Sequence, residues 1–408
     1  MQKKIYQFLW VLGVTIAILS APVGLMRLVN ILWAGHYHKF LIPVIIILAL
    51  TGIIFLIINR RLKFDSVSII LLTALFFGSF VGILNFETMS LRYFISHFFG
   101  ALFMLVVYLY AINQNIDIIW LEKFIGKSSV WLVIIFFLVL SFFWVVSIFI
   151  FDGNLYLGIG TGYLILPFAY YLVHSKFKLS FFVFFLILVS GKRGPLLSVI
   201  IVFLFFLPFY FKKNLIKSIF ITLITVGFFL FLILITEGLT NFEGLPIYLS
   251  GPLQKLSVLN PNAESYNEDL AFSGRNQELI LASTHFFKSS INIFIGHGFG
   301  WSYFFNAVIQ GSTTTDFNVH YVHIAPANFF LTLGFPLAVL ILSTIGFGFV
   351  KAYLISIIKP PSKITLVILL FWIGDFANSL SGYSYPIDPL FWLSLAYLKV
   401  NMYKLKLM

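Results

Sequence analysis

The chain contains no cysteine, and charged residues make up only 10% of it. The absence of cysteine excludes disulfides and metal sites with thiolate ligands. The scarcity of charge, together with 61% hydrophobic residues and a mean hydropathy of +1.03, excludes a soluble globular domain. The 408 residues therefore predict a polytopic membrane protein.

Acidic residues are few as well: 14 stand against 26 lysines and arginines, which gives a formal net charge of +12. The basic residues fall in short clusters between apolar segments and form no single patch, so nucleic acid is not an expected partner. Placing most of these clusters on the cytoplasmic side gives twelve spans with both chain ends in the cytoplasm. The stretch after Met1-Gln2-Lys3-Lys4 is long enough to be retained as a helix, and no cleavable signal peptide is expected.

Long, uniformly apolar runs predict an all-α helix bundle, because each span must satisfy its backbone hydrogen bonds inside lipid. The expected spans are 5–22, 40–58, 66–84, 93–112, 130–150, 155–173, 177–190, 195–211, 216–236, 323–350, 363–380 and 387–400. This divides the chain into a first block of nine transmembrane helices (1–236), one large extracytoplasmic loop (237–322) and a last block of three helices (323–408).

The loop 237–322 differs from the other connections, which are short. Long connections inside compact domains are usually functional or disordered. It opens with proline, glycine and asparagine residues, and Arg275 to Ile291 then predicts an amphipathic helix with Leu279, Ile280, Phe286 and Phe287 on its apolar face. Such a helix could lie on the membrane surface and cover a cavity.

The segment Ser190–Pro195 (Ser-Gly-Lys-Arg-Gly-Pro) places two adjacent cations in a glycine turn between apolar segments. A cation at the centre of a span costs about 2.5–3.5 kcal/mol, and the preceding helix, about 21 Å long, is shorter than a hydrocarbon core of about 30 Å. In one interpretation Lys192, Arg193 and the helix that starts at Gly194 bind a phosphate-like anion. In the other, the segment is a hairpin whose cations extend into the lipid headgroups.

Two motifs in the loop carry similar alternatives. Arg275, in Ser273-Gly274-Arg275, is either a second ligand for phosphate or sugar, or an exposed arginine paired with Glu278. The segment Gly296–Gly300 (Gly-His-Gly-Phe-Gly) resembles a dinucleotide-binding loop, but no strand precedes it, so a flexible return of the loop toward the bundle explains it better.

His320 and His323 share one helical face if the tenth span starts early, and Asp316 precedes them by about a turn. Two histidines and one carboxylate make a poor metal site. One histidine could instead accept a proton from a hydroxyl, or simply form interfacial hydrogen bonds. Inside the eleventh span, Asp375 and Asn378 either line a polar path or hold neighbouring helices together.

In this order and on these sides, the motifs resemble the bacterial O-antigen polymerase and O-antigen ligase superfamily. The matching pattern is the Ser-x-x-Arg-Gly turn at 190–194, an arginine at 275, the glycine-rich return at 296–300, and a histidine at 323 ahead of Gly334. The resemblance covers roughly residues 180–340. Many relatives have asparagine directly after the histidine, whereas this chain has Ile324, so His320 is an alternative candidate.

The resemblance implies a GT-C-like membrane glycosyltransferase of the bacterial inner membrane, acting on its extracytoplasmic side. It implies polymerisation of oligosaccharide repeat units carried on undecaprenyl pyrophosphate, for an O-antigen or capsule. The implied catalytic residues are Arg193 and Arg275 on the phosphates and His323 as the base, and the residues implied to bind substrate are Lys192, Gly194, Glu278 and His320.

The expected partners are this lipid-linked oligosaccharide, the membrane lipids, a chain-length regulator and a flippase. No metal or cofactor is expected, because pyrophosphate is already a good leaving group and arginines can stabilise its charge. Two other functions stay open: a ligase that moves finished glycan to a lipid A core, and a transporter of the same lipid-linked sugar.

Overall fold

A computed structural model describes residues 2–29, 63–85, 89–113, 117–150, 161–190, 192–211, 227, 275–307, 315–319, 324–380 and 388–407. The described chain is almost entirely helical, as a backbone surrounded by lipid requires. The predicted spans 40–58 and 216–236 lie outside these residues, apart from residue 227.

Helices lie at each of the other predicted spans. In chain order they are α1 (Gln2–Val29), α3 (Ser66–Leu84), α4 (Leu91–Ile112), α5 (Ile118–Ile150), the short 3₁₀ helix η1 (Gly162–Leu164) with α6 (Ile165–Val173), α7 (Phe177–Val189), α8 (Arg193–Phe211), α14 (Ala325–Ile358), α15 (Lys363–Ser379) and α16 (Pro389–Leu407).

Five helical segments of the described chain are long and apolar enough to cross a membrane. They are Ser66–Leu84, Leu91–Ile112, Ile118–Val146, Gly194–Phe211 and Ala325–Ile358. These helices support a membrane protein, as the composition predicts.

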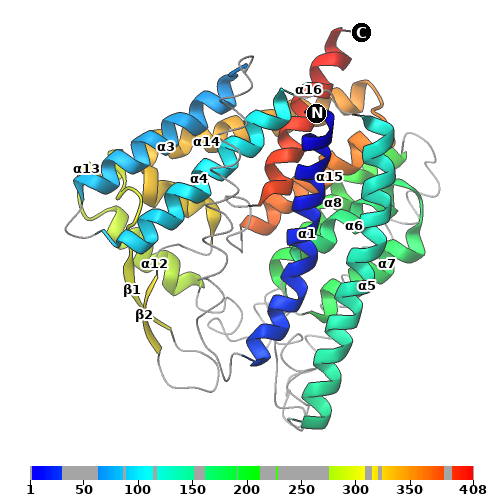
Figure 1. Cartoon of the computed structure of the whole chain (residues 1–408), viewed down its shortest axis with the longest axis horizontal. Helices are drawn as coiled ribbons and strands as arrows, with labels where there is room; N and C mark the ends of the chain where they lie inside the picture. Colours follow the sequence, from blue (N-terminus) through cyan, green and yellow to red (C-terminus); the bar gives the residue numbers. More distant parts are fainter. Residues whose placement is uncertain are drawn as a thin grey trace.

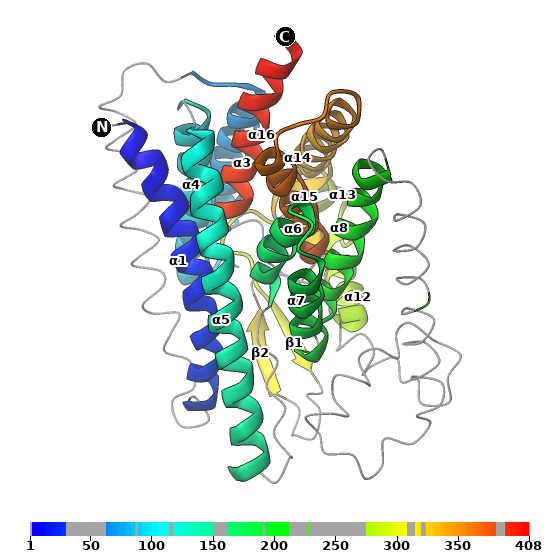
Figure 2. The same cartoon turned by 90° about the vertical axis from the view of Figure 1, so that its right-hand side faces the viewer.

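The helices form two groups (Figure 1). α3 and α4 lie side by side and are inclined to the upright helices α1 and α5, and a 90° turn of the view shows α6, α7, α8 and α15 on the other side of α5 (Figure 2). The two chain ends lie at the same end of the molecule, whereas three short elements of the loop lie toward the opposite end: α12 (Arg275–Phe286), β1 (Tyr303–Ala307) and β2 (Thr315–Val319) (Figure 1).

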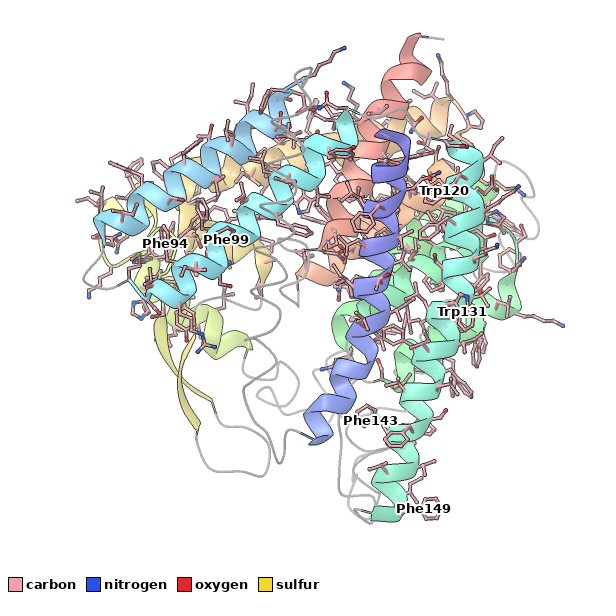
Figure 3. All side chains as sticks on the ribbon, in the orientation of Figure 1. Phe94, Phe99, Trp120, Trp131, Phe143 and Phe149 are labelled. Carbon is pink, nitrogen blue, oxygen red and sulfur yellow. The ribbon has the colours of Figure 1, made fainter. Side chains whose placement is uncertain are left out.

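The surface of the bundle is apolar, as expected for lipid contact. Along α5, drawn from Trp120 to Phe149 in Figure 3, Trp131 is 59% and Phe149 78% exposed, whereas Phe143 is 5% exposed and packs inside the protein. Because lipid is as apolar as the protein interior, exposed and buried faces of α5 carry the same residue types.

An ionic contact fixes three helices at the end that carries the termini. Asp65 caps α3 by accepting a hydrogen bond from Ser68 N at 2.9 Å, and its other oxygen accepts from Tyr108 Oη of α4 at 2.8 Å and pairs with Lys399 of α16. Burial opposes ionisation of Asp65, but the hydrogen bonds from Lys399, Ser68 and Tyr108 hold its pKa below the ordinary value.

The part of the loop that the structure describes contains two features that the sequence did not predict. The expected helix from Arg275 to Ile291 is two helices, α12 (Arg275–Phe286) and α13 (Ser290–Ile295). The all-α expectation is also incomplete, because β1 (Tyr303–Ala307) and β2 (Thr315–Val319) form an antiparallel pair in which Tyr303 lies opposite Val319.

The expected apolar face of α12 is split. Phe286 is 7% exposed and packs with Ala282, Trp301 and Leu331, whereas Ile280 is 63% exposed. The exposed side continues past the end of α12 through three large residues that are each more than 60% exposed: Phe287, Ile291 and Phe294. The split face fits a pair of helices with protein on one side and the membrane surface on the other.

The glycine-rich return at 296–300 is clamped between α3, α4 and α14. His297 N and Gly298 N donate to the carbonyls of Leu331 and Thr332 at 2.8 and 3.0 Å. Phe299 N donates to Gly78 O of α3 at 2.8 Å, and Gly300 O accepts from Ser90 N, just before α4, at 3.0 Å. The return is therefore tightly packed, and the expectation of a flexible segment is wrong.

Glycine is required at both sides of this contact. Gly298 has φ 77°, and a Cβ there would collide with the backbone of Gly82 on α3. Gly334 has φ 75° inside α14, so it interrupts the helix, and a Cβ there would collide with the carbonyl oxygen of Phe294 at the end of α13. The break in α14 thus provides the space into which the loop packs.

We predict that Gly298→Ala lowers the free energy of unfolding by at least about 2 kcal/mol, because the new side chain adds both backbone strain and a collision with α3. Thermal unfolding of the purified protein in detergent measures the change. The control is Gly346→Ala on α14, where a Cβ meets nothing within 4 Å, so alanine should be neutral or slightly stabilising. Equal melting temperatures for the two variants would contradict the packing of the return.

Candidate functional site

The cationic corner is the segment from Ser190 to Gly194 that joins α7 to α8. α7 has only 13 residues, or about 20 Å of helix, so it is too short to cross a hydrocarbon core of about 30 Å. Ser190 is 2% exposed, and its Oγ lies 2.9 Å from Thr161 Oγ1, just ahead of η1, and donates to Ile187 O at 2.7 Å. The serine of the motif therefore anchors the corner to a neighbouring element.

The start of α8 forms the second half of the corner. Lys192 is partly exposed, and α8 begins at the following Arg193. Gly194 and Pro195 are buried, and Ser198 Oγ donates to Gly194 O at 2.8 Å. The first turn of a helix carries N–H groups without intrahelical partners and the positive end of the dipole, so an anion is favoured at this point.

Gly162, the residue after Thr161, packs against Asn378 and so links the corner to α15. A Cβ on Gly162 would lie 2.6 Å from Asn378 Nδ2 of α15. One turn earlier on α15, Gly374 permits close packing, since a Cβ there would lie 2.5 Å from Ile165 of α6 and 2.6 Å from Val202 of α8. The polar residues of α15 are thereby held against the elements that carry the corner.

Asp375 of α15 faces a second carboxylate that the sequence reasoning missed. Asp388 directly precedes α16, and its Oδ1 accepts a hydrogen bond from Leu390 N at 2.8 Å. Both aspartates are 3% exposed, and their side chains interact with each other. The side chain of Asn378 contacts Asp375. Tyr163 of η1 interacts electrostatically with both carboxyl groups. An aspartate followed by proline at the start of an apolar run is a typical helix N-cap, and this signal could have identified Asp388.

Two histidines of the loop, His285 and His297, lie among the described residues and contact the same tryptophan. His297 stacks on Trp301 with ring centroids 4.8 Å apart, and His285 of α12 contacts the same indole edge to face at 5.9 Å. Burial lowers the pKa of His297 to about 4, mainly by desolvation. A hydrogen bond with the His285 backbone raises this pKa, whereas the nearby charges of His285 and Lys288 lower it further. His297 is therefore neutral at neutral pH.

The return does not form a phosphate-binding loop. The N–H groups of residues 296–299 all donate to backbone carbonyls, and Gly300 N donates to His97 Nδ1 of α4 at 3.2 Å. Trp301 is 8% exposed between the two imidazoles, so its ring is not a free surface for a sugar.

The structure places the other predicted site residues only in part. Arg193 starts α8, and Arg275 and Glu278 lie in the first turns of α12, but the described structure does not include their side chains. His320 and His323 lie outside the described residues; α14 starts at Ala325, after Ile324 as its N-cap. The structure thus brings Lys192, Gly194, Asp375 and Asp388 onto connected elements, and the roles of the arginines and histidines stay predictions.

Compared with known proteins, the chain matches no family model, no curated protein and no solved structure.

We predict that stability falls as the pH drops from about 6.5 toward about 4, because the unfolded chain then binds a proton at His297 that the folded chain excludes. The loss approaches about 3 kcal/mol at the acid end. Melting temperatures at about pH 7 and about pH 4.5 should differ more for the wild type than for His297→Gln. An equal difference in both proteins would contradict a desolvated imidazole at 297.

Proposed function

We propose that the chain is a polysaccharide polymerase of the bacterial inner membrane, which joins oligosaccharide repeat units carried on undecaprenyl pyrophosphate to build an O-antigen or capsule chain. The observation that supports this most is the cationic corner. Its two cations follow a helix too short to cross the membrane, and the buried contact between Ser190 and Thr161 anchors the end of that helix. A pair of adjacent cations at a helix start in an apolar protein suits the diphosphate headgroup of a lipid.

In the proposed reaction, the growing glycan on its lipid pyrophosphate is the donor. A hydroxyl of the incoming lipid-linked unit attacks the anomeric carbon, the bond from that carbon to the pyrophosphate oxygen breaks, and the hydroxyl proton passes to a base. The leaving group gains negative charge as the bond breaks. Catalysis therefore depends on stabilising that charge and on positioning the acceptor.

Each predicted residue has a role in this scheme. Arg193, helped by Lys192 and by Gly194 in the first turn of α8, holds the donor pyrophosphate. Arg275 contacts the second phosphate or the phosphates of the acceptor. His323 is the base, with His320 as its substitute and Glu278 or Asp316 as further alternatives. Where Glu278 is not the base, it binds substrate.

The architecture that goes with this function is a GT-C-like bundle of about twelve spans with an extracytoplasmic loop at 237–322. Two observations support it. The termini lie at one end of the molecule while α12 and the β1–β2 pair lie toward the other (Figure 1). The loop also packs back on α3, α4 and α14 through residues 296–300, so it is joined to the bundle.

A transporter of the same lipid-linked sugar is the second candidate, favoured by the buried pair Asp375 and Asp388. Ionisable residues inside a bundle commonly mark ion pathways in transporters. A ligase is chemically equivalent to the polymerase and would use the same residues with a lipid A core as acceptor.

Arg193→Ala and Arg193→Lys should both lower the yield of polymer at least about tenfold, which corresponds to about 1.4 kcal/mol. Lysine fails because it cannot form the bidentate contact of a guanidinium with phosphate oxygens. The assay incubates membranes with undecaprenyl-pyrophosphate-linked repeat units and resolves products by chain length. Lys178→Ala, which removes an exposed cation near the other end of α7, should leave the yield unchanged.

The same assay separates the three functions. Chain growth without core lipid supports the polymerase, and transfer only when core lipid is added supports the ligase. Movement of intact units across the bilayer of proteoliposomes with no new glycosidic bond supports the transporter. Full-length polymer from both Arg193 variants would contradict the role of the corner.

A further inference from the structure

Asp375 and Asp388 form a carboxyl pair inside the helical bundle. Each is 3% exposed, and the pair lies between η1, α15 and the start of α16. As carboxylates they can only accept hydrogen bonds, and the Oδ2 atom of each has no hydrogen-bond partner in the structure. Because the two side chains also interact with each other, one shared donor would satisfy both unpartnered acceptor atoms.

In the described part of the chain, no basic side chain supplies that donor. Within the described residues, no lysine, arginine or histidine forms an ion pair with either carboxylate. The described groups that act on the pair are the amide of Asn378, the tyrosine Tyr163 of η1 and the backbone N–H groups at the start of α16. Around Gly374, α6 and α8 contribute the apolar side chains of Ile165 and Val202. Two buried, adjacent negative charges would each cost several kcal/mol of desolvation and would also repel each other.

We propose that Asp375 and Asp388 bind one proton between them and so form a proton-binding site within the membrane-embedded part of the protein. The proton lies on Oδ2 of Asp375 and is donated to Oδ2 of Asp388, which makes one strong O–H···O⁻ hydrogen bond from two unpartnered acceptors.

The assignment of the proton to Asp375 follows from the neighbouring groups. Asp388 Oδ1 already accepts the N–H of Leu390 at 2.8 Å at the N-terminal end of α16, where the helix dipole favours a negative charge. Asp375 lies within α15 and has no comparable helix end. Asp388 therefore carries the charge and Asp375 the proton.

This site can exchange its proton with little structural change. A donor or cation that approaches Asp388 competes with Asp375 for the same oxygen, and the proton on Asp375 is then free to leave. Such a pair suits a step that accepts or releases a proton inside the membrane. The inference does not depend on the proposed function, and its test uses no sugar substrate.

The test is infrared spectroscopy of the purified full-length protein in lipid nanodiscs, with aspartate labelled by ¹³C at its side-chain carboxyl. At neutral pH the wild type should show one labelled, protonated carboxyl that is resolved from ionised aspartates. The band should disappear in Asp375→Asn, because the new amide donates to Asp388 and no proton is needed. It should remain in Asp117→Asn, which alters an aspartate capping the start of α5 outside the pair.

A wild-type spectrum without any protonated aspartate at neutral pH overturns the proposal, as does a band that persists unchanged in a folded Asp375→Asn protein. Gel filtration and thermal unfolding establish whether that variant is folded. Where it does not fold, the labelled wild-type spectrum alone decides, because it requires no substitution.

Discussion

The cost of placing charge inside an apolar bundle governs this structure. With charged residues at 10% of the chain, each buried or recessed ionisable group needs a partner or a role. Asp65 has Lys399 and Tyr108 as partners, and it joins α3, α4 and α16 at the end with the termini. Among the described basic residues none is an ionic partner of the carboxyl pair, and the pair lies with the cationic corner on elements that contact one another through Thr161, Gly162 and Asn378.

Two glycines allow the loop to pack closely against the membrane helices. The break at Gly334 leaves the carbonyls of Leu331 and Thr332 without intrahelical donors. The N–H groups of the return at 296–300 donate to these two carbonyls instead. Gly298 permits the approach to α3 that this pairing needs. As a result the loop is attached to the membrane helices, and α12 is held at a fixed position over them through Phe286 and Trp301.

Hydrophobic patterning predicted the helices well because apolar runs and their caps are local features. The expected span 66–84 coincides with α3, whose start is set by the capping box of Asp65 and Ser68. The early end of α12 was missed because Ser283 and Thr284 bond back to carbonyls three residues earlier, while Ser289 caps the new helix α13. The strands of the β1–β2 pair are only five residues each, and β1 (Tyr-Phe-Phe-Asn-Ala) carries no alternation of polar and apolar residues.

The site was predicted only in part, because only those of its features that are local in the sequence can be recognised there. The corner is recognisable because its cations, glycines and proline are adjacent, and α8 starts within it at Arg193, one residue before the expected Gly194. The carboxyl pair is not recognisable, because Asp375 and Asp388 lie on different elements and meet only when α15 and α16 pack. The roles of Arg193, Arg275 and His323 stay predictions, since they depend on a bound substrate.

The proposed function requires the cationic corner to face the side of the membrane opposite to the termini. The cysteine-free chain allows a direct test with single cysteines at Lys192→Cys and Lys178→Cys, at opposite ends of α7. A membrane-impermeant maleimide should label the first in intact spheroplasts and the second only after permeabilisation. Labelling of Lys178→Cys in intact spheroplasts, with Lys192→Cys protected until permeabilisation, would contradict the account.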